Sequence, residues 1–209
     1  MSSIKALPTS GLVRDSAGSP IVRTECILVV DDEPQSREMH AVALGSWGYK
    51  SVVAQNGFEA LLKVAEHSPD LVISDLRMRG MSGFELLSVL RRRYPEIPVL
   101  CISGEYDPLH IPPHVVCDTF LKKGSYALPE LRANIAELLC GERRAAHSKR
   151  PQAVVWLPKG RDDYYTVTCT NCLRTFTMRG TTEKEHSEEH TSCPHCQTEL
   201  TFFIEGSRA

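Results

Sequence analysis

The chain has 209 residues, with 24 basic and 26 acidic side chains and a formal net charge of −2 at pH 7. This length suffices for one or two domains with a sizeable core, and the near-neutral charge gives no general attraction to nucleic acid or to anionic membranes. No apolar run is long enough to span a bilayer, and the N-terminus lacks the apolar segment of a secretory signal, so we expect a cytoplasmic protein.

Residues 1–24 are rich in serine, glycine and proline and have no periodicity, which predicts a flexible tail. Residues 25–142 alternate apolar runs with helical patterns. The expected strands are 26–30, 50–55, 71–74, 98–103 and 118–123, and the expected helices are 36–48, 58–67, 83–94 and 127–141. Apolar strands that alternate with helices predict a doubly wound α/β fold with a five-stranded parallel sheet.

Two of the expected helices have a recognisable apolar face. These faces consist of Met39, Val42, Ala43 and Trp47 on the first helix, and of Leu128, Leu131, Ile135 and Leu138 on the last. We expect these residues to pack on the sheet. Gly48 should end the first helix.

Polar residues stand at the carboxyl ends of four expected strands. Asp31 and Asp32 follow the first strand, Asp75 follows the third, and Ser103 and Lys123 end the last two. Ligands bind at this edge of a doubly wound sheet. Three neighbouring carboxylates require a cation or raised pKa values, and an oxygen-only site favours Mg²⁺. A carboxylate beside Mg²⁺ can accept a phosphoryl group, while an ammonium and a hydroxyl stabilise the developing charge.

These residues lie in four blocks of sequence: ILVVDDEP, LVISDLRMRGMSGFELL, VLCISG and TFLKKG. In order and separation the blocks resemble the receiver domain of bacterial two-component response regulators, over somewhat more than half of the chain. The resemblance implies that Asp75 is the phospho-acceptor and that Ser103 and Lys123 contact the phosphoryl group. It also implies that Phe120 is an aromatic switch residue, and that a histidine kinase or phosphotransfer protein is the donor.

The same resemblance implies a Mg²⁺ site. Asp32 would bind the ion directly, Asp31 largely through water, and Asp75 and the backbone carbonyl of Arg77 would complete the protein ligands. A degenerate receiver that keeps the fold without being phosphorylated is the rival interpretation. The complete set of acids argues against it.

The sequence departs from the receiver pattern at three places. Gly124 follows Lys123 where the family usually has proline in a cis bond, so we expect a trans bond with glycine supplying the unusual dihedral angles. Arg79 also replaces a usual proline. Residues 104–117 contain three prolines where the family has a helix, which predicts a turn or loop and an altered output surface.

After a basic, polar linker at residues 143–163, residues 164–209 contain two CxxC pairs, Cys169 with Cys172 and Cys193 with Cys196. Pairs separated by twenty residues are typical of a structural zinc site with four thiolates. We therefore expect a small β-rich, zinc-ribbon-like domain with a hairpin around each pair. Its expected apolar core is Tyr165, Phe176, Leu200, Phe202 and Phe203.

Other interpretations of these cysteines remain open. His186 and His190 could replace one pair in a two-cysteine, two-histidine site, although the segment around them has no apolar face. A redox pair is disfavoured because there is no room for a thioredoxin-like domain. Of the four remaining cysteines, Cys26 and Cys101 lie in apolar strands and are expected to be buried, inert thiols.

Residues 161–209 contain five basic and eight acidic side chains, so this part of the chain is a poor phosphate binder. We therefore expect a phosphorelay regulator that is not an enzyme and that signals to an unknown output protein through protein contacts. The alternative is a nucleic-acid-binding transcriptional effector that uses the ribbon and the basic linker. Salt-dependent nucleic-acid binding would distinguish the two.

Overall fold

The computed structural model describes residues 12–14, 20–22, 24–104, 117–140, 155–157, 164–179 and 188–204. The larger unit comprises β3 (Cys26–Val30), α1 (Pro34–Ser46), β4 (Lys50–Ala54), α2 (Gly57–His67), β5 (Leu71–Asp75), α3 (Gly83–Arg93), β6 (Val99–Ser103), β7 (Thr119–Lys122) and α4 (Leu128–Leu139). None of the helices in these ranges combines the length and the hydropathy needed to cross a membrane.

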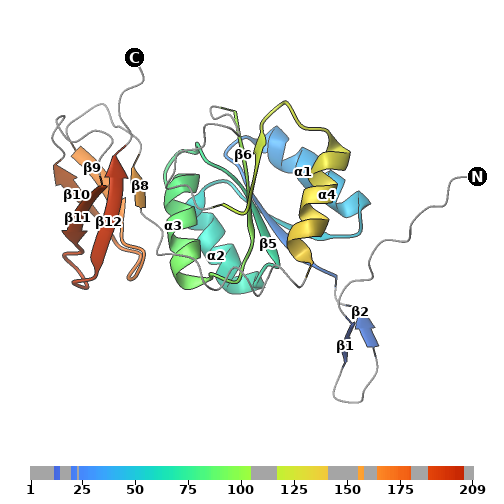
Figure 1. Ribbon diagram of the computed structural model, residues 1–209, viewed down its shortest axis with the longest axis horizontal. Coiled ribbons are helices and arrows are strands. Elements are labelled where there is room, and N and C mark those ends of the chain that lie inside the picture. The colour runs from blue at the N-terminus through green and yellow to red at the C-terminus, as the bar shows by residue number, and fades with distance from the viewer. Residues whose placement is uncertain are drawn as a thin grey trace, which may run out of the picture.

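The five strands form a parallel sheet in the order β4-β3-β5-β6-β7. Helices α2 and α3 cover one face of the sheet, and α1 and α4 cover the other (Figure 1). Two apolar clusters correspond to these faces, one built around Phe84 and Leu90 of α3 and one around Leu44 of α1 and Ile135 of α4. The predicted doubly wound fold is therefore confirmed, and its strand order places β5 at the centre, between β3 and β6.

Local signals fix where the helices begin and end. Asn56 accepts a hydrogen bond from the Glu59 N–H and caps α2, while Ser82 and Glu85 form a capping box at the start of α3. Pro34 begins α1 two residues earlier than expected, because proline is tolerated in the first turn. Gly48 follows α1 with a φ of 89°, as a helix-ending glycine does.

The predicted apolar face of α1 is wrong in part. Met39 is 47% exposed and Val42 is 68% exposed, whereas Ser36 and His40 are buried beside Ala43 and Leu44. The helix is rotated so that polar residues face the sheet edge, where they make hydrogen bonds. On α4 the predicted residues Leu131, Ile135 and Leu138 are buried, but Leu128 is 46% exposed.

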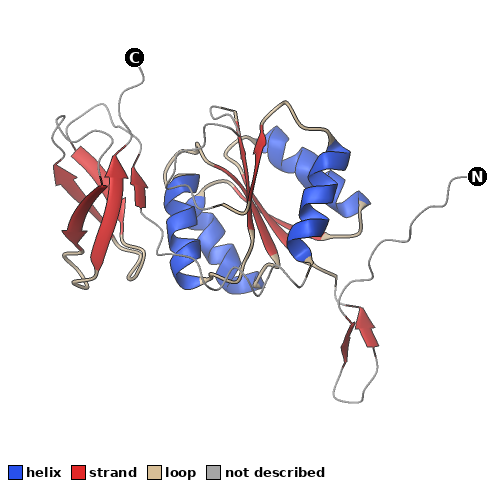
Figure 2. Cartoon of the chain, viewed as in Figure 1, coloured by secondary structure: helices blue, strands red, loops and turns tan. Residues whose placement is uncertain are grey.

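The described residues of the C-terminal unit form strands and the turns between them (Figure 2). It comprises β8 (Val155–Leu157), β9 (Tyr164–Thr168), β10 (Thr175–Arg179), β11 (Glu188–Ser192) and β12 (Glu199–Ile204). β9 and β10 form one antiparallel hairpin, β11 and β12 form a second, and β8 pairs in parallel with β12. Tyr165, Leu200 and Phe202 are buried in its core and Phe176 packs against them, as expected. The unit thus has the predicted hairpin around each cysteine pair.

Several expectations fall wholly or partly outside the described residues. They concern the proline-rich segment, of which 105–116 are not described, the basic linker except for β8, His186, and the side chain of Phe203, which was expected in the core of the C-terminal unit. Within the expected N-terminal tail, β1 (Leu12–Arg14) pairs with β2 (Pro20–Val22) in a short antiparallel hairpin.

Candidate functional site

The three aspartates predicted to converge do so at the carboxyl edge of the sheet. Asp31 and Asp32 directly follow β3, and Asp75 is the last residue of the neighbouring strand β5. One carboxylate oxygen from each lies within 4.8 Å of the others. Asp31 and Asp75 are buried, whereas Asp32 is half-buried. Such an all-oxygen donor set at the end of a parallel sheet fits a hard divalent cation.

Hydrogen bonds fix both carboxylate oxygens and the backbone carbonyl of Asp31. Its Oδ1 accepts a hydrogen bond of 2.9 Å from the Glu33 N–H, and its Oδ2 accepts one of 2.6 Å from the Ser36 hydroxyl. The Arg37 guanidinium donates to the Asp31 backbone carbonyl over 2.5 Å. Each donor comes from the start of α1, so the helix that follows β3 fixes the orientation of this carboxylate.

Lys123 joins the acids from the end of β7. Its Nζ lies 3.0 Å from Asp31 Oδ2, 3.2 Å from Asp75 Oδ2 and 3.3 Å from Glu33 Oε2. Burial lowers the pKa of Lys123, but the hydrogen bonds and charges of Asp31 and Asp75 outweigh burial and leave that pKa above its ordinary value. The ammonium is therefore a permanent positive charge between the two buried carboxylates.

Opposing influences also act on the pKa of the Asp75 carboxyl, but here burial dominates. Burial raises its pKa above the ordinary value, and the negative charge of Asp31 adds to the rise. The Arg77 N–H, which donates to Asp75 Oδ1 over 3.1 Å, and the Lys123 ammonium offset part of it. A carboxylate in such surroundings gains from a cation that replaces its lost hydration.

The remaining predicted residues surround the same edge. Ser103 ends β6 and is fully buried, and its hydroxyl has no hydrogen-bond partner within the part of the chain that the structure describes. Phe120 lies on the neighbouring strand β7, paired with Cys101, and is partly buried against the cluster of α2 and α3. The bond between Lys123 and Gly124 is trans, with a glycine φ of 79°, as expected.

Residues 27–118 match the family model of the response regulator receiver domain. The chain contains a receiver domain. The match begins within β3 and ends one residue before β7, so it includes all three aspartates and Ser103.

Relatives of this receiver domain occur in longer regulators. NtrX, a nitrogen assimilation regulatory protein of Azorhizobium caulinodans, is 33% identical over 126 residues, which is 59% of this chain and 26% of NtrX. ZraR, a transcriptional regulatory protein of Klebsiella oxytoca, is 43% identical over 78 residues, or 37% of this chain and 18% of ZraR. The chain thus spans about a quarter or less of the length of these curated relatives.

The fold of the receiver domain has a counterpart among solved structures. The chemotaxis response regulator CheY4 of Vibrio cholerae has a TM-score of 0.51 and is 28% identical. The similarity covers 56% of this chain and 99% of CheY4. The C-terminal cysteines lie outside residues 27–118, which the family model matches.

The four cysteines of the two CxxC pairs form a second candidate site, separate from the receiver pocket. Their sulfurs all lie within 4.8 Å of one another, with Sγ–Sγ distances of 3.6 Å between Cys169 and Cys196 and 3.7 Å between Cys172 and Cys193. A tetrahedral zinc ion with bonds of about 2.3 Å requires sulfurs about 3.8 Å apart. The cluster is therefore consistent with a zinc-binding module.

The two pairs repeat the same backbone turn. In the first, the Leu173 N–H donates to the Cys169 carbonyl and the Cys169 N–H donates to the Arg174 carbonyl; in the second, Gln197, Cys193 and Thr198 make the equivalent bonds. Leu173 and Gln197 both have a φ of 61°, a left-handed conformation that closes the turn. Two copies of one local turn thus place their sulfurs face to face.

The thiols differ in how easily they lose a proton. Hydrogen bonds from Thr198 and Asn171 lower the pKa of Cys196 to about 5, whereas burial raises the pKa of Cys169 to about 12. Of these two thiols, Cys196 loses its proton more readily, and Cys169 depends more on a metal to displace its proton.

The two-histidine alternative gains no support from His190. Its ring lies 3.2 Å from the Thr201 hydroxyl, on the exposed side of the β11–β12 hairpin, and it does not belong to the sulfur cluster. Cys26 and Cys101 are buried in β3 and β6 as expected.

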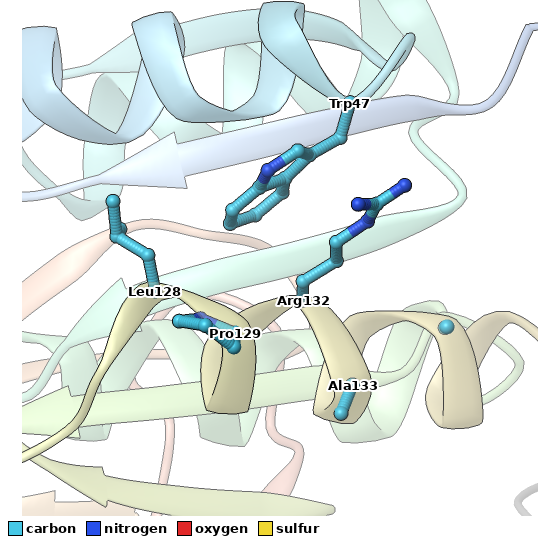
Figure 3. A pocket seen from close by; sticks show the side chains of 6 residues that line it. Trp47, Leu128, Pro129, Arg132 and Ala133 are labelled. Carbon is cyan, nitrogen blue, oxygen red and sulfur yellow. The ribbon is translucent and has the colours of Figure 1, made fainter. Parts of the chain in front are cut away.

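A shallow pocket of about 350 Å³ lies between the end of α1 and α4 (Figure 3). Trp47 and Leu128 line it, and the Arg132 guanidinium lies 5.9 Å from the centre of the Trp47 ring. None of the three aspartates lines this pocket. It accounts for the exposure of Leu128, which borders the pocket instead of the core.

Sequence reasoning missed several residues that support the sites. The Ser36 hydroxyl donates to Asp31, and the Glu33 carboxylate lies beside the Lys123 ammonium. Both residues follow Asp31 and Asp32 within one helical turn. The His40 ring lies 2.7 Å from the Tyr126 hydroxyl, which ties α1 to the loop after Lys123. A capping motif signals Ser82 and Glu85, but no local pattern signals the contact of Glu85 with Thr168.

Proposed function

We propose that this protein is a phosphorelay regulator whose receiver accepts a phosphoryl group on Asp75 from a histidine kinase or a phosphotransfer protein. Receiver domains as a family are phosphorylated by histidine kinases. The observation that carries the proposal is the meeting of three carboxylates, the Lys123 ammonium and the Ser103 hydroxyl at one edge of the sheet. Among the described residues, that hydroxyl has no hydrogen-bond partner. We assign the receiver to residues 25–142, an output module to 164–209 and a linker to 143–163, and strand β8 of the linker pairs with β12 of the module.

Asp75 would act as the nucleophile. Its carboxylate oxygen attacks the phosphorus atom, the bond between phosphorus and the donor nitrogen breaks, and an acyl phosphate forms on Asp75. Lys123 already lies 3.2 Å from this carboxylate, and together with the Ser103 hydroxyl it would contact the phosphoryl oxygens. Phe120, on the strand β7 that leads into Lys123, would respond to the position of Ser103.

A magnesium ion would supply the positive charge that the transferred phosphoryl group requires. Asp31, Asp32, Asp75 and the backbone carbonyl of Arg77 are the residues we propose to hold it. The all-oxygen donor set and the buried, hydrogen-bonded state of Asp31 support this assignment.

The experiment uses acetyl phosphate and Mg²⁺ with the full-length protein. Wild type should gain one phosphoryl group, seen by intact mass and removed by hydroxylamine, and Asp75→Asn should gain none. Glu66→Gln, at an exposed carboxylate on α2, is the matched control and should behave as wild type. Equal phosphorylation of Asp75→Asn and wild type would refute the assignment, and an unphosphorylated wild type would indicate a degenerate receiver.

We further propose that Cys169, Cys172, Cys193 and Cys196 bind one structural Zn²⁺. The sulfur spacing and the repeated turn support a closed site without an open coordination position. Purified protein should contain one zinc per chain, and Cys193→Ser should lose it. Cys140→Ser, which changes an exposed thiol, should keep it. Unchanged zinc in Cys193→Ser would refute the site.

The C-terminal module would then act on an output protein through protein contacts. Eight acidic side chains against five basic ones over residues 161–209 argue against a phosphate backbone as its target. Binding of the full chain to duplex or single-stranded nucleic acid should be weak and nearly independent of salt. A steep salt dependence would favour a nucleic-acid-binding effector instead.

A further inference from the structure

Helix α3 is buried along almost its whole length. A helix on the face of a sheet normally buries one stripe and exposes the other, yet every residue from Gly83 to Arg91 is buried. Phe84, Leu87 and Leu90 face the receiver core. On the other side β8 of the C-terminal module lies beside the helix (Figure 1). The module thus covers the face of α3 that would otherwise meet solvent.

One buried carboxylate joins the two units. Glu85 Oε1 accepts a hydrogen bond of 3.1 Å from the Thr168 hydroxyl, while its Oε2 accepts bonds of 3.1 Å and 3.2 Å from the N–H and hydroxyl of Ser82. Glu85 is 8% exposed and Thr168 is 2% exposed. A buried carboxylate that loses a donor incurs a desolvation penalty. Glu85 is therefore well satisfied only while the module is docked.

Within the receiver, the residues next to Glu85 at the start of α3 contact the backbone of Asp75. Ser82 caps α3, and the next residue, Gly83, donates its N–H to the Leu76 carbonyl over 3.1 Å. A Cβ atom on Gly83 would lie 2.0 Å from the Asp75 carbonyl oxygen and 2.7 Å from the Leu76 Cα. The first turn of α3 is thus in direct contact with the backbone of Asp75, and a shift of that turn moves the backbone on which the carboxylate stands.

Within the C-terminal module, Thr168 is next to the four-cysteine cluster. Thr168 is the last residue of β9 and immediately precedes Cys169, whose sulfur is 3.6 Å from that of Cys196. A metal held by four thiolates ties the two hairpins together, and small modules of this kind lose their fold when the metal is removed. The position of the Thr168 hydroxyl therefore depends on the state of the cluster.

We propose that Glu85 and Thr168 are positioning residues that couple the four-cysteine centre to the phosphoryl pocket, so that loss of its metal slows phosphorylation of Asp75. With the metal bound, Thr168 holds Glu85, Glu85 holds the cap of α3, and the cap fixes the Asp75 backbone. When the metal is lost, the first turn of α3 is released and the carboxylate is less well placed for attack. This inference rests on the proposed function of Asp75 and of the zinc site.

The test compares isosteric variants of the full chain. Thr168→Val removes the hydroxyl and Thr168→Ser keeps it, while Thr175→Val changes the exposed cross-strand neighbour of Thr168. The initial rate of phosphorylation by acetyl phosphate with Mg²⁺ should fall about 5- to 10-fold in Thr168→Val, at the weak end of coupling between linked sites. It should be normal in Thr168→Ser and Thr175→Val. Zinc content, measured in each variant, should stay at one per chain.

A second arm removes zinc from each protein with a chelator that is cleared before Mg²⁺ is added. Zinc removal should slow wild type at least as much as Thr168→Val does, because Thr168→Val keeps the backbone hydrogen bond from Thr168 to Glu85. It should slow Thr168→Val by a smaller factor than wild type, because the hydroxyl contact is already broken. Equal slowing of both proteins, or a normal rate in zinc-loaded Thr168→Val, would overturn the coupling.

Amide hydrogen exchange separates this inference from the proposed function. Exchange over residues 76–83 should quicken in Thr168→Val and in zinc-free wild type but not in Thr175→Val. This readout does not require phosphorylation, so it tests the contact even where Asp75 accepts no phosphate. Unchanged exchange in both would refute the connection between the module and the pocket.

Discussion

Gly83→Ala tests whether α3 is in as close contact with Asp75 as the structure indicates. The added methyl would lie 2.0 Å from the Asp75 carbonyl oxygen, 2.7 Å from the Leu76 Cα and 2.9 Å from the Asp75 carbonyl carbon. All three atoms belong to the backbone, so no side chain can rotate away and the first turn of α3 must move. Overpacking of this kind costs about 1–3 kcal/mol, and with backbone on every side we expect the upper end of that range.

The higher helix propensity of alanine offsets part of this loss of stability. Replacing glycine by alanine in a helix interior stabilises by up to about 1 kcal/mol, and at the first position of α3 the gain is smaller. We therefore expect the free energy of unfolding to fall by about 2 kcal/mol. Because the displaced turn contacts the Asp75 backbone, the phosphorylation rate should also fall.

Urea titration monitored by circular dichroism measures the free energy, and acetyl phosphate measures the rate. Gly45→Ala is the matched control, since it lies within α1 and a Cβ there meets nothing within 4 Å. This variant should be as stable as wild type or up to about 1 kcal/mol more stable. A Gly83→Ala protein with wild-type stability and rate would show that the contact between α3 and Asp75 is looser than described.

Two further substitutions test the support of the pocket. Ser36→Ala removes the 2.6 Å hydrogen bond to Asp31, so Mg²⁺ affinity in calorimetric titration should fall about 10-fold, and an unchanged affinity would exclude a supporting role. His40→Gln tests pH dependence: burial lowers the pKa of His40 below 6.5, although the Ser36 carbonyl and the Asp31 carboxylate partly oppose this. The unfolded chain then binds the proton more readily, so wild type should lose stability as pH falls below 6.5 through the lowered pKa. In urea titrations at pH 7.5 and 5.5 this loss should shrink in His40→Gln but not in a variant of the exposed His67; equal losses would contradict the assignment.

Much of the receiver site could be predicted from sequence because parallel strands end at one edge. Asp31, Asp32 and Asp75 each follow an apolar run, and the topology then brings them together whatever the detailed packing. The cysteine pairs were predictable for a similar reason, since each pair is a local turn and the spacing between them is short.

The misplaced face of α1 has a physical cause. Apolar periodicity selected Met39 and Val42, but the helix buries Ser36 and His40 because they hydrogen-bond with Asp31 and Tyr126. Buried polar residues with specific partners do not follow a hydropathy pattern. The same limit explains why the bond between Glu85 and Thr168, which are 83 positions apart, could not be foreseen.

The ammonium of Lys123 has a consequence for the order in which ligands reach the pocket. Asp31, Asp32 and Asp75 are three carboxylates at one sheet edge, and the Lys123 ammonium contacts two of them. These carboxylates would repel an anionic phosphodonor, whereas a divalent cation bound among them would offset their negative charge. Cation first and donor second is therefore the favoured sequence, and at a fixed donor concentration the supply of Mg²⁺ would decide how often the receiver can be loaded.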